Sequence, residues 1–288
     1  KNGKVIEQNP EGFILGKFGS VGSGVGQFKK PESIAIAGDG ALLVLDTGNS
    51  RLNRVELSNK LKVRPLAANL ETKILASGPS RSWNVAAEAM AAVGTDLFVW
   101  LAKDGQFARL DDEGKEKQRF GSKLAKGPSA TRATRGFAVS QKLGLFVSDT
   151  GNSRLQQFAL DGTWTRNIAE STGFFDSKKK EGRVKDPRGV AINDQGTVYV
   201  ADAGNRRVDA FSPEGVFLFG IGPTVGSHEL LEPTAVAWDR ARFVYFVDKG
   251  LKKIFKTEPS GSFIAAWGEA GSGPGQFEEP SALAFDGN

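Results

Sequence analysis

Residues 46–52 read Asp46-Thr47-Gly48-Asn49-Ser50-Arg51-Leu52, and the same seven letters return as residues 149–155. Looser copies begin at Asp202 and at Asp248. The first two copies lie 103 residues apart, which is two units of about 51, and the later copies follow after 53 and 46 residues. Repeats of this length are typical of propeller blades and of solenoid arrays. The sequence therefore predicts an internally repeated fold.

Short apolar runs surround each copy, and they predict β-strands rather than helices. The runs are about four to six residues long, rich in β-branched and aromatic residues, and bounded by turn signals such as Pro213-Glu214-Gly215. In the fourth copy we expect four strands, at 189–192, 197–201, 207–211 and 216–219. Four antiparallel strands per unit are typical of a propeller blade.

A second repeated motif indicates the number of units. Gly-Ser-Gly-Val-Gly-Gln-Phe at 22–28 returns as Gly-Ser-Gly-Pro-Gly-Gln-Phe at 271–277, 249 residues or five periods of about 50 later. Residues 4–19 read as the third and fourth strands of one more unit, and residues 280–286 read as a first strand. We therefore expect an all-β, six-bladed β-propeller of four-stranded antiparallel blades, with the sixth blade shared between the two chain ends.

Residues 1–288 are expected to form a single propeller domain, because closed all-β folds of this length need not divide. At residue 288 the last unit stops where every other unit continues into its second strand. We therefore expect these residues to be a fragment of a longer polypeptide, with one strand missing from the sixth blade.

The repeated unit resembles the NHL repeat family. Units of that family read Pro-x-Gly-Val-Ala-Val, then Val-Tyr-Val-Ala-Asp-x-x-Asn-x-Arg-Val, then Phe-x-x-x-Gly and Phe-Gly, and residues 187–220 match almost completely. The first and third units match clearly. The fifth has Leu251 in place of the Asn, and the second has Trp100-Leu101 where the Asp is expected. The resemblance implies a six-bladed propeller and a role in binding, as in NHL sensor, scaffold and RNA-binding proteins.

Few side chains in this sequence can build a catalytic or metal centre. There is no Cys and one His, His228, which excludes thiolate zinc sites, cysteine nucleophiles and multi-histidine centres. One Ser-His-Asp triad stays formally open, although an ordinary loop role is favoured for His228. Gluconolactonase-like and strictosidine-synthase-like propellers, which resemble this fold, hold a metal in the central channel. Because no unit places an unusual Asp, Glu or Asn at a channel-facing first-strand position, we predict no metal and no cofactor.

The Asp-x-Gly-Asn-x-Arg loop is the most repeated polar feature, and a structural role is favoured for its Asp and Asn. The Asp is expected to cap the turn through its own backbone, and Gly48, Gly151, Gly204 and Gly250 are expected to adopt positive φ. The Arg, at Arg51, Arg154 and Arg206 or Arg207, could either pair with the Asp of an adjacent blade or face outward.

Blade topology sorts the charges onto two faces. The loops between second and third strands and the connectors between blades share one face, the loop face, while the tight turns share the other, the turn face. The turn face is predicted to be acidic and the loop face mainly basic, within a net charge of +5. The candidate binding residues on the loop face are Arg135, Arg154, Lys178, Lys179, Lys180, Arg183, Lys185, Arg206 and Arg207. The alternative for residues 178–185 is a solvated connector without a partner.

These observations favour a non-catalytic interaction or scaffold domain that binds a protein partner or an acidic polysaccharide through one propeller face. RNA binding is the alternative, permitted by a pI of about 9.3, with Phe174-Phe175 as the one candidate stacking platform. A lactonase or lyase activity is least supported. No membrane insertion is expected within these residues, because the apolar runs are far too short. The lack of Cys and the scarcity of Met and His resemble bacterial periplasmic, cell-surface or secreted proteins.

Overall fold

The computed structural model describes residues 3–55, 81–84, 87–111, 114–121, 130–170, 182–239 and 242–285. The described residues form four-stranded antiparallel sheets and several two-stranded pairs, and they contain no α-helix. Three single turns of 3-10 helix, η1 (Thr47–Asn49), η2 (Thr150–Asn152) and η3 (Ala203–Asn205), lie in the repeated Asp loops. The predicted all-β class is confirmed.

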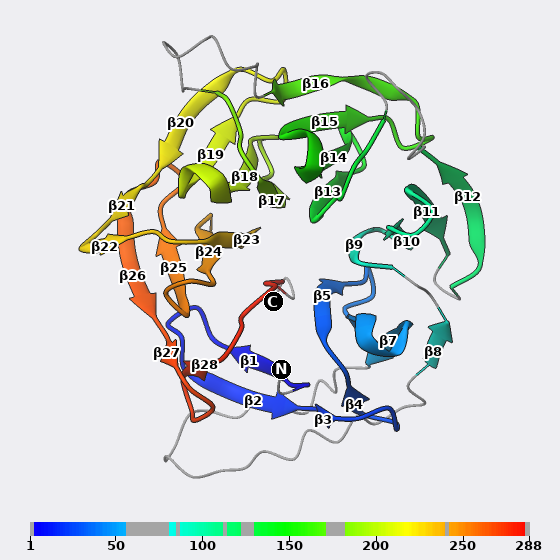
Figure 1. Cartoon of the computed structure of the whole chain (residues 1–288), viewed down its shortest axis with the longest axis horizontal. Helices are drawn as coiled ribbons and strands as arrows, with labels where there is room; N and C mark the ends of the chain where they lie inside the picture. Colours follow the sequence, from blue (N-terminus) through cyan, green and yellow to red (C-terminus); the bar gives the residue numbers. More distant parts are fainter. Residues whose placement is uncertain are drawn as a thin grey trace.

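Five four-stranded sheets surround a central axis (Figure 1), and in each sheet the first strand is innermost and the fourth outermost. The first two blades are β5 (Pro31–Ile36), β6 (Leu42–Asp46), β7 (Arg51–Val55), β8 (Arg81–Asn84), and β9 (Ala89–Val93), β10 (Asp96–Leu101), β11 (Gln106–Leu110), β12 (Glu116–Phe120). The third blade is β13 (Gly136–Ser140), β14 (Gly144–Asp149), β15 (Arg154–Phe158) and β16 (Trp164–Glu170). The fourth and fifth are β17 (Pro187–Ile192), β18 (Val198–Asp202), β19 (Arg207–Phe211), β20 (Phe217–Ile221), and β23 (Pro233–Trp238), β24 (Val244–Asp248), β25 (Lys253–Thr257), β26 (Phe263–Trp267).

Short strand pairs form the connectors that enter some blades. The parallel pair β3 (Ser20–Val21) and β4 (Gln27–Phe28) precedes the first blade. The antiparallel pair β21 (Thr224–Val225) and β22 (His228–Glu229) precedes the fifth. The parallel pair β27 (Glu269–Ala270) and β28 (Gln276–Phe277) follows it.

The predicted number of six blades is not confirmed. Between the fifth and first blades the structure has the two-stranded hairpin β1 (Val5–Gln8) and β2 (Ile14–Phe18), and the segment 280–285 runs inside it toward the axis (Figure 1). That segment was expected to be a strand, but it forms none among the described residues. The repeat arithmetic counts sequence units, whereas a strand requires a hydrogen-bonded neighbour, and no described second strand lies beside 280–285.

The second strands are apolar because a blade is covered on both faces by its neighbours. All residues of β6, β14, β18 and β24 are buried. Each core cluster combines side chains from adjacent blades. One contains Phe98 and Phe107 of the second blade with Phe137 and Phe158 of the third. Phe107 stacks on Phe120 at 5.3 Å between ring centroids and meets Phe137 edge-on at 5.2 Å. These interdigitated aromatic rings hold neighbouring blades together.

Small side chains line the hub, where the first strands converge. Ala191 of β17 is 8% exposed and packs in one cluster with Tyr199 of its own blade and Val236 of the next. Adjacent first strands, such as β17 and β23, contact each other directly. The hub therefore leaves little room for a larger residue at this position.

We expect Ala191→Leu to destabilise the protein by roughly 1–3 kcal/mol, because added methylenes in a packed interior force neighbouring side chains apart. Chemical denaturation followed by tryptophan fluorescence measures this free energy of unfolding. Ala270→Leu is the matched control, because Ala270 is exposed. Equal stability of the two variants would contradict the placement of Ala191 in a packed hub.

Candidate functional site on the loop face

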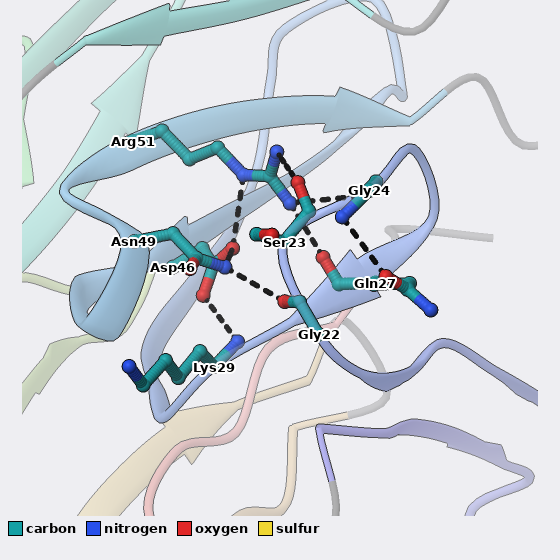
Figure 2. A network of polar contacts seen from close by, with 8 residues as sticks. All are labelled: Gly22, Ser23, Gly24, Gln27, Lys29, Asp46, Asn49 and Arg51. Atoms are coloured by element: carbon teal, nitrogen blue, oxygen red, sulfur yellow. Dashed lines mark hydrogen bonds and ion pairs between the residues drawn. The ribbon is translucent and has the colours of Figure 1, made fainter.

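The repeated Asp loop is built around a buried carboxylate (Figure 2). In the first blade, Asp46 Oδ1 accepts a hydrogen bond from the backbone N–H of Lys29 at 2.6 Å. Its Oδ2 accepts from Asn49 Nδ2 at 2.6 Å and from Arg51 Nε at 3.0 Å. Asp46 is fully buried. A buried carboxylate is tolerated here because each of these three groups donates a hydrogen bond to it.

The same arrangement recurs in the third and fourth blades. Asp149 accepts from Arg132 N at 2.6 Å, Asn152 Nδ2 at 2.8 Å and Arg154 Nε at 2.7 Å. In the fourth blade, Asp202 accepts from Lys185 N at 2.7 Å and from Asn205 Nδ2 at 2.7 Å. The Arg thus contacts the Asp of its own blade, not that of an adjacent blade.

Arg51 also ties the preceding connector to the first blade. Its guanidinium donates to the backbone carbonyls of Ser23 at 2.7 Å, Gly24 at 3.0 Å and Gln27 at 2.6 Å (Figure 2). Asn49 Nδ2 reaches a fourth connector carbonyl, that of Gly22, at 2.9 Å. The Asp, Asn and Arg side chains therefore form a polar strut between a blade and the connector that enters it.

The predicted roles of Asp and Gly within the loop are wrong in detail. In the first, third and fourth blades the Asp makes no side-chain cap of its own turn, and its Oδ1 instead accepts from a connector N–H 17 residues earlier in the chain. Gly48 lacks positive φ; the left-handed conformation falls two residues later, at Ser50 with φ 50°. A Cβ on Gly48 would lie 2.2 Å from the carbonyl oxygen of Lys29, which also accepts the Gly48 N–H at 2.7 Å. Close backbone approach, not positive φ, requires the glycine.

Two blades build the loop differently. In the fifth, Asp248 accepts from the backbone N–H of Leu251 at 3.0 Å in place of the missing Asn side chain. In the second, Leu101 stands at the Asp position, and the loop closes through Gly105 N donating to Leu101 O at 2.8 Å. The deviations predicted from the sequence are therefore real, and backbone groups replace the side chains.

Removal of the buried carboxylate should unfold the loop and its connector together. We expect Asp149→Ala to cost about 3–5 kcal/mol, because Arg154 would lose its partner in a site with little solvent. Glu116→Ala is the control: it breaks an exposed pair with Arg119, for which about 0–1 kcal/mol is expected. Thermal and denaturant unfolding measure both losses. Similar losses of stability in the two variants would contradict the role of the buried carboxylate as a strut.

The fourth blade carries a second buried carboxylate, Asp209, beside Asp202. Arg207 Nε lies 2.7 Å from Asp209 Oδ1 and 3.5 Å from Asp202 Oδ2, so two carboxylates share one guanidinium. Burial, followed by repulsion from Asp202, raises the pKa of Asp209 from 3.8 to about 8. Burial also raises the pKa of Asp202. The corresponding third-strand residue is Asn53 in the first blade and Gln156 in the third, so this acid is particular to the fourth.

Because the folded protein raises the pKa of Asp209, the folded state holds the proton more tightly than the unfolded chain does. The stability from this group is present below about pH 4 and is lost as pH rises through about 8. We therefore expect Asp209→Asn to be stabilising relative to the natural protein at pH 8, on the order of 1–3 kcal/mol, with little gain near pH 4. Melting temperatures measured across this range test it. A pH-independent difference would contradict the raised pKa.

The candidate binding residues fall into three groups. Arg154, Arg183 and Arg207 are half-buried, and Arg154 and Arg207 contact the Asp of their own blade. Arg135, Lys185 and Arg206 are exposed on the loop face. Lys178, Lys179 and Lys180, together with Phe174 and Phe175, lie outside the described residues. Binding itself is untested for all three groups.

A repeated position explains part of the basic surface. The residue whose backbone N–H binds the Asp is Lys29 in the first blade, Arg132 in the third and Lys185 in the fourth, and all three side chains are exposed. Main-chain geometry therefore places one base beside each of these Asp loops. The fifth blade has Leu231 at this position. The equivalence of Lys29, Arg132 and Lys185 required the structure.

The central channel is a cavity of about 310 Å³ lined by the first strands. Glu32, Glu88 and Arg135 line its mouth on the loop face. Glu32 forms an ion pair with Lys30 at 2.8 Å. The prediction that no first-strand acid faces the channel is therefore wrong for Glu32 in β5, and Glu88 precedes β9. The sequence reading overlooked them because both directly precede the apolar part of the strand.

Arg188, at the start of β17, stands close to this mouth and was not among the predicted site residues. It forms ion pairs with Asp186 at 2.8 Å and with Glu232 of the next connector at 2.6 Å. Its position between Pro187 and Gly189, equivalent to that of Arg135 before Gly136 in the third blade, was the available signal. In the described part of the chain, no group of three His, Asp or Glu side chains could hold a metal ion.

The turn face is less acidic than the turn sequences indicate, because bases from the third and fourth strands reach it. Arg54 pairs with Asp39, and Arg109 and Lys117 both pair with Asp96. These contacts hold the pKa of Asp39 and of Asp96 below its usual value. His228 lies in β22, where its ring packs edge-on against Phe255 at 5.4 Å, and it does not line the central cavity.

Residues 185–211, which span the first three strands of the fourth blade and its Asp loop, match the NHL repeat family. The chain is a β-propeller with a match to the NHL repeat in its fourth blade. A 111-residue stretch is 34% identical to peptidylglycine alpha-amidating monooxygenase of Rattus norvegicus, and the Mus musculus protein matches equally. The match covers 34% of this chain and 11% of the rat protein, so the chain spans about a tenth of that relative's length.

Solved structures share the propeller fold at low sequence identity. A Bacteroides caccae protein of unknown function matches with a TM-score of 0.64 and 13% identity, over 99% of this chain and 94% of that chain. A chain of a nidogen/laminin complex matches with a TM-score of 0.60 and 16% identity over 83% of this chain and 80% of that chain. A catalytically inactive His-to-Ala variant of virginiamycin B lyase from Staphylococcus aureus, solved with quinupristin, also matches. Its TM-score is 0.58 and its sequence identity 11%, over 99% of this chain and 78% of that chain.

No helix among the described residues is long and apolar enough to cross a membrane.

Proposed function

We propose that this propeller is an interaction or scaffold domain that binds an acidic partner, a protein surface or an acidic polysaccharide, through its loop face. The proposed contact sector runs from Arg135 in the third blade through Lys185 to Arg206 in the fourth, and it includes Lys178, Lys179 and Lys180. We also propose an extracytoplasmic, bacterial location, on the compositional grounds given above.

One observation carries this proposal: bases remain exposed on the loop face after the Asp loops have used their own Arg residues. Arg154 and Arg207 are held by the blade. Arg132, Arg135, Lys185 and Arg206 are exposed, although neither the loop nor the strand geometry requires a base in their place. Exposed like charges on one face raise the local concentration of an anionic partner and favour its orientation.

A lyase or lactonase activity is the least supported candidate, although one feature of the channel is compatible with it. The channel cavity has polar side chains at its mouth, Glu32, Glu88 and Arg135, and fold neighbours include virginiamycin B lyase. That neighbour is described as inactive when one histidine is replaced. The one histidine here, His228, packs against Phe255 away from the channel. The chemistry of the channel therefore favours a binding role over this activity.

The test uses Arg135→Gln, Lys185→Gln and Arg206→Gln together, with heparin and poly-L-glutamate as probes. We expect roughly tenfold weaker binding at low salt and a flatter salt dependence, because exposed charges act mainly through screened attraction. A second triple variant, with glutamine at Lys178, Lys179 and Lys180, examines the rest of the sector. Biolayer interferometry at several ionic strengths gives the affinities.

The matched control removes three exposed bases from the turn face: Lys115→Gln, Lys142→Gln and Arg242→Gln. It changes the net charge equally, so an equal loss of binding would point to total charge and reject the proposed sector. Single-stranded poly(U) is measured in parallel. RNA binding that exceeds binding to both acidic probes and is lost in the loop-face variant would favour RNA as the partner.

A further inference from the structure

The loop-face end of the central channel, here called the channel mouth, is surrounded by the starts of the first strands (Figure 1). Each blade contributes one side chain at an equivalent position, directly before a small residue of its first strand, and segment 280–285 contributes a sixth. In the first, second, third and fifth blades, that small residue pairs with the residue before the Asp position, which supports the equivalence. The six are Glu32, Glu88, Arg135, Arg188, Thr234 and Ser281.

These six side chains are sorted by charge around the mouth. The first and second blades supply acids, the third and fourth supply arginines, and the fifth blade and segment 280–285 supply hydroxyl groups. Glu88 and Arg135 belong to neighbouring blades, so they stand at the boundary between the acidic and the basic part. The mouth is therefore dipolar rather than uniformly basic or acidic.

The contacts show which of the four charges are available to a ligand. Glu32 and Arg188 already form ion pairs with neighbouring side chains, at 2.8 Å and 2.6 Å. Glu88 and Arg135 are exposed, and in the part of the chain that the structure describes neither side chain forms a hydrogen bond or an ion pair. One acid and one base thus remain free, side by side in the ring.

Close packing of the first strands fixes the positions of these two residues. A Cβ on Gly136, directly after Arg135, would lie 2.7 Å from the carbonyl oxygen of Arg188 in the next blade. The strands β9 and β13, which follow Glu88 and Arg135 directly, contact each other. The backbone at the mouth therefore has little freedom, and it presents the free carboxylate and the free guanidinium in a constant arrangement.

The pKa of Lys30 shows that both free charges act at the same place. The hydrogen bond and the charge of Glu32 raise this pKa most, the charge of Glu88 adds to the rise, and the charge of Arg135 opposes it. A molecule bound at the mouth thus meets a negative charge from one blade and a positive charge from the next.

Below the mouth the channel offers an apolar volume. The cavity of about 310 Å³ is lined by side chains such as Ala35, Ala138, Val139 and Ala191. Thr234 Oγ1, at the mouth, is buried and forms no hydrogen bond within the described part of the chain. Buried polar atoms normally have a partner, so this hydroxyl marks a point at which a bound molecule can be held.

We propose that the channel mouth binds a small zwitterion, an α-amino acid with an apolar side chain. The ammonium group lies against the Glu88 carboxylate, and the carboxylate accepts hydrogen bonds from the Arg135 guanidinium. The apolar side chain enters the channel, where it leaves water. The Thr234 hydroxyl is a further donor for the carboxylate. This site goes beyond the loop-face proposal and does not depend on it, although Arg135 belongs to both.

The test measures binding of L-phenylalanine to the natural protein by isothermal titration calorimetry, and saturable one-to-one binding is expected. Three control ligands each lack one feature. 3-Phenylpropionate lacks the ammonium group, 2-phenylethylamine lacks the carboxylate, and glycine lacks the apolar side chain. Each should bind about tenfold more weakly or worse, because a charge-assisted contact or the burial of the ring is lost.

Two variants at exposed positions assign each charge. Glu88→Gln should lower the affinity for L-phenylalanine about tenfold and leave that for 3-phenylpropionate unchanged, because this ligand has no ammonium group. Arg135→Gln should likewise weaken binding of L-phenylalanine but not that of 2-phenylethylamine. Glu258→Gln, at an exposed acid in a turn of the opposite face, is the matched control and should bind L-phenylalanine normally. Photolysis of bound 4-azido-L-phenylalanine should label the first strands.

Any of three results would overturn the proposal. The first is an absence of saturable L-phenylalanine binding to the natural protein. The second is equal affinity for L-phenylalanine and a ligand that lacks one charge, and the third is labelling confined to residues outside the first strands. Glu88→Gln should also bind heparin at least as well as the natural protein does. Failure of this proposal and failure of the loop-face proposal therefore give different results.

Discussion

The buried carboxylate at the end of the second strand is the interaction on which the ring depends. Taking a carboxylate out of water is costly unless donors surround it, and here a connector N–H, an Asn amide and an Arg guanidinium do so. The donors come from the loop and from the connector that links the blade to its predecessor. A local requirement for charge compensation thus ties each such blade to the connector that enters it.

The blades show how far this strut can vary. The second blade replaces the Asp by Leu101 and relies on backbone closure and aromatic packing around Phe107. The fifth keeps Asp248 but satisfies it with backbone donors. The fourth adds Asp209 next to the same guanidinium, where burial raises the pKa of Asp209 to about 8. Because packing between blades is extensive, loss of one polar contact in one blade does not prevent ring formation.

The strut also determines what the loop face presents to solvent. It binds the Arg of each complete motif, so the most conspicuous bases of the repeat are those least able to meet a partner. The bases that remain exposed are those whose backbone N–H, rather than side chain, binds the Asp. Examples are Lys29, Arg132 and Lys185. Their number in each sector decides the charge of the face. This supports the basic sector as the contact surface, and it directs attention away from Arg154 and Arg207.

The sequence by itself determined the repeat, the four-stranded unit, the apolar second strands and the all-β propeller, because each depends on residues close together in the chain. The period-2 and turn signals of 187–220 placed the fourth-blade strands within about two residues of the strands β17 to β20. Only the tertiary structure decided which donors the Asp uses, why Gly48 must be glycine, and that Glu32 and Arg188 stand near the channel mouth. These features depend on approaches between segments distant in sequence. The sixth sector shows the same limit: residues 280–285 have the letters of a strand, but a strand forms only where a neighbour supplies its hydrogen bonds.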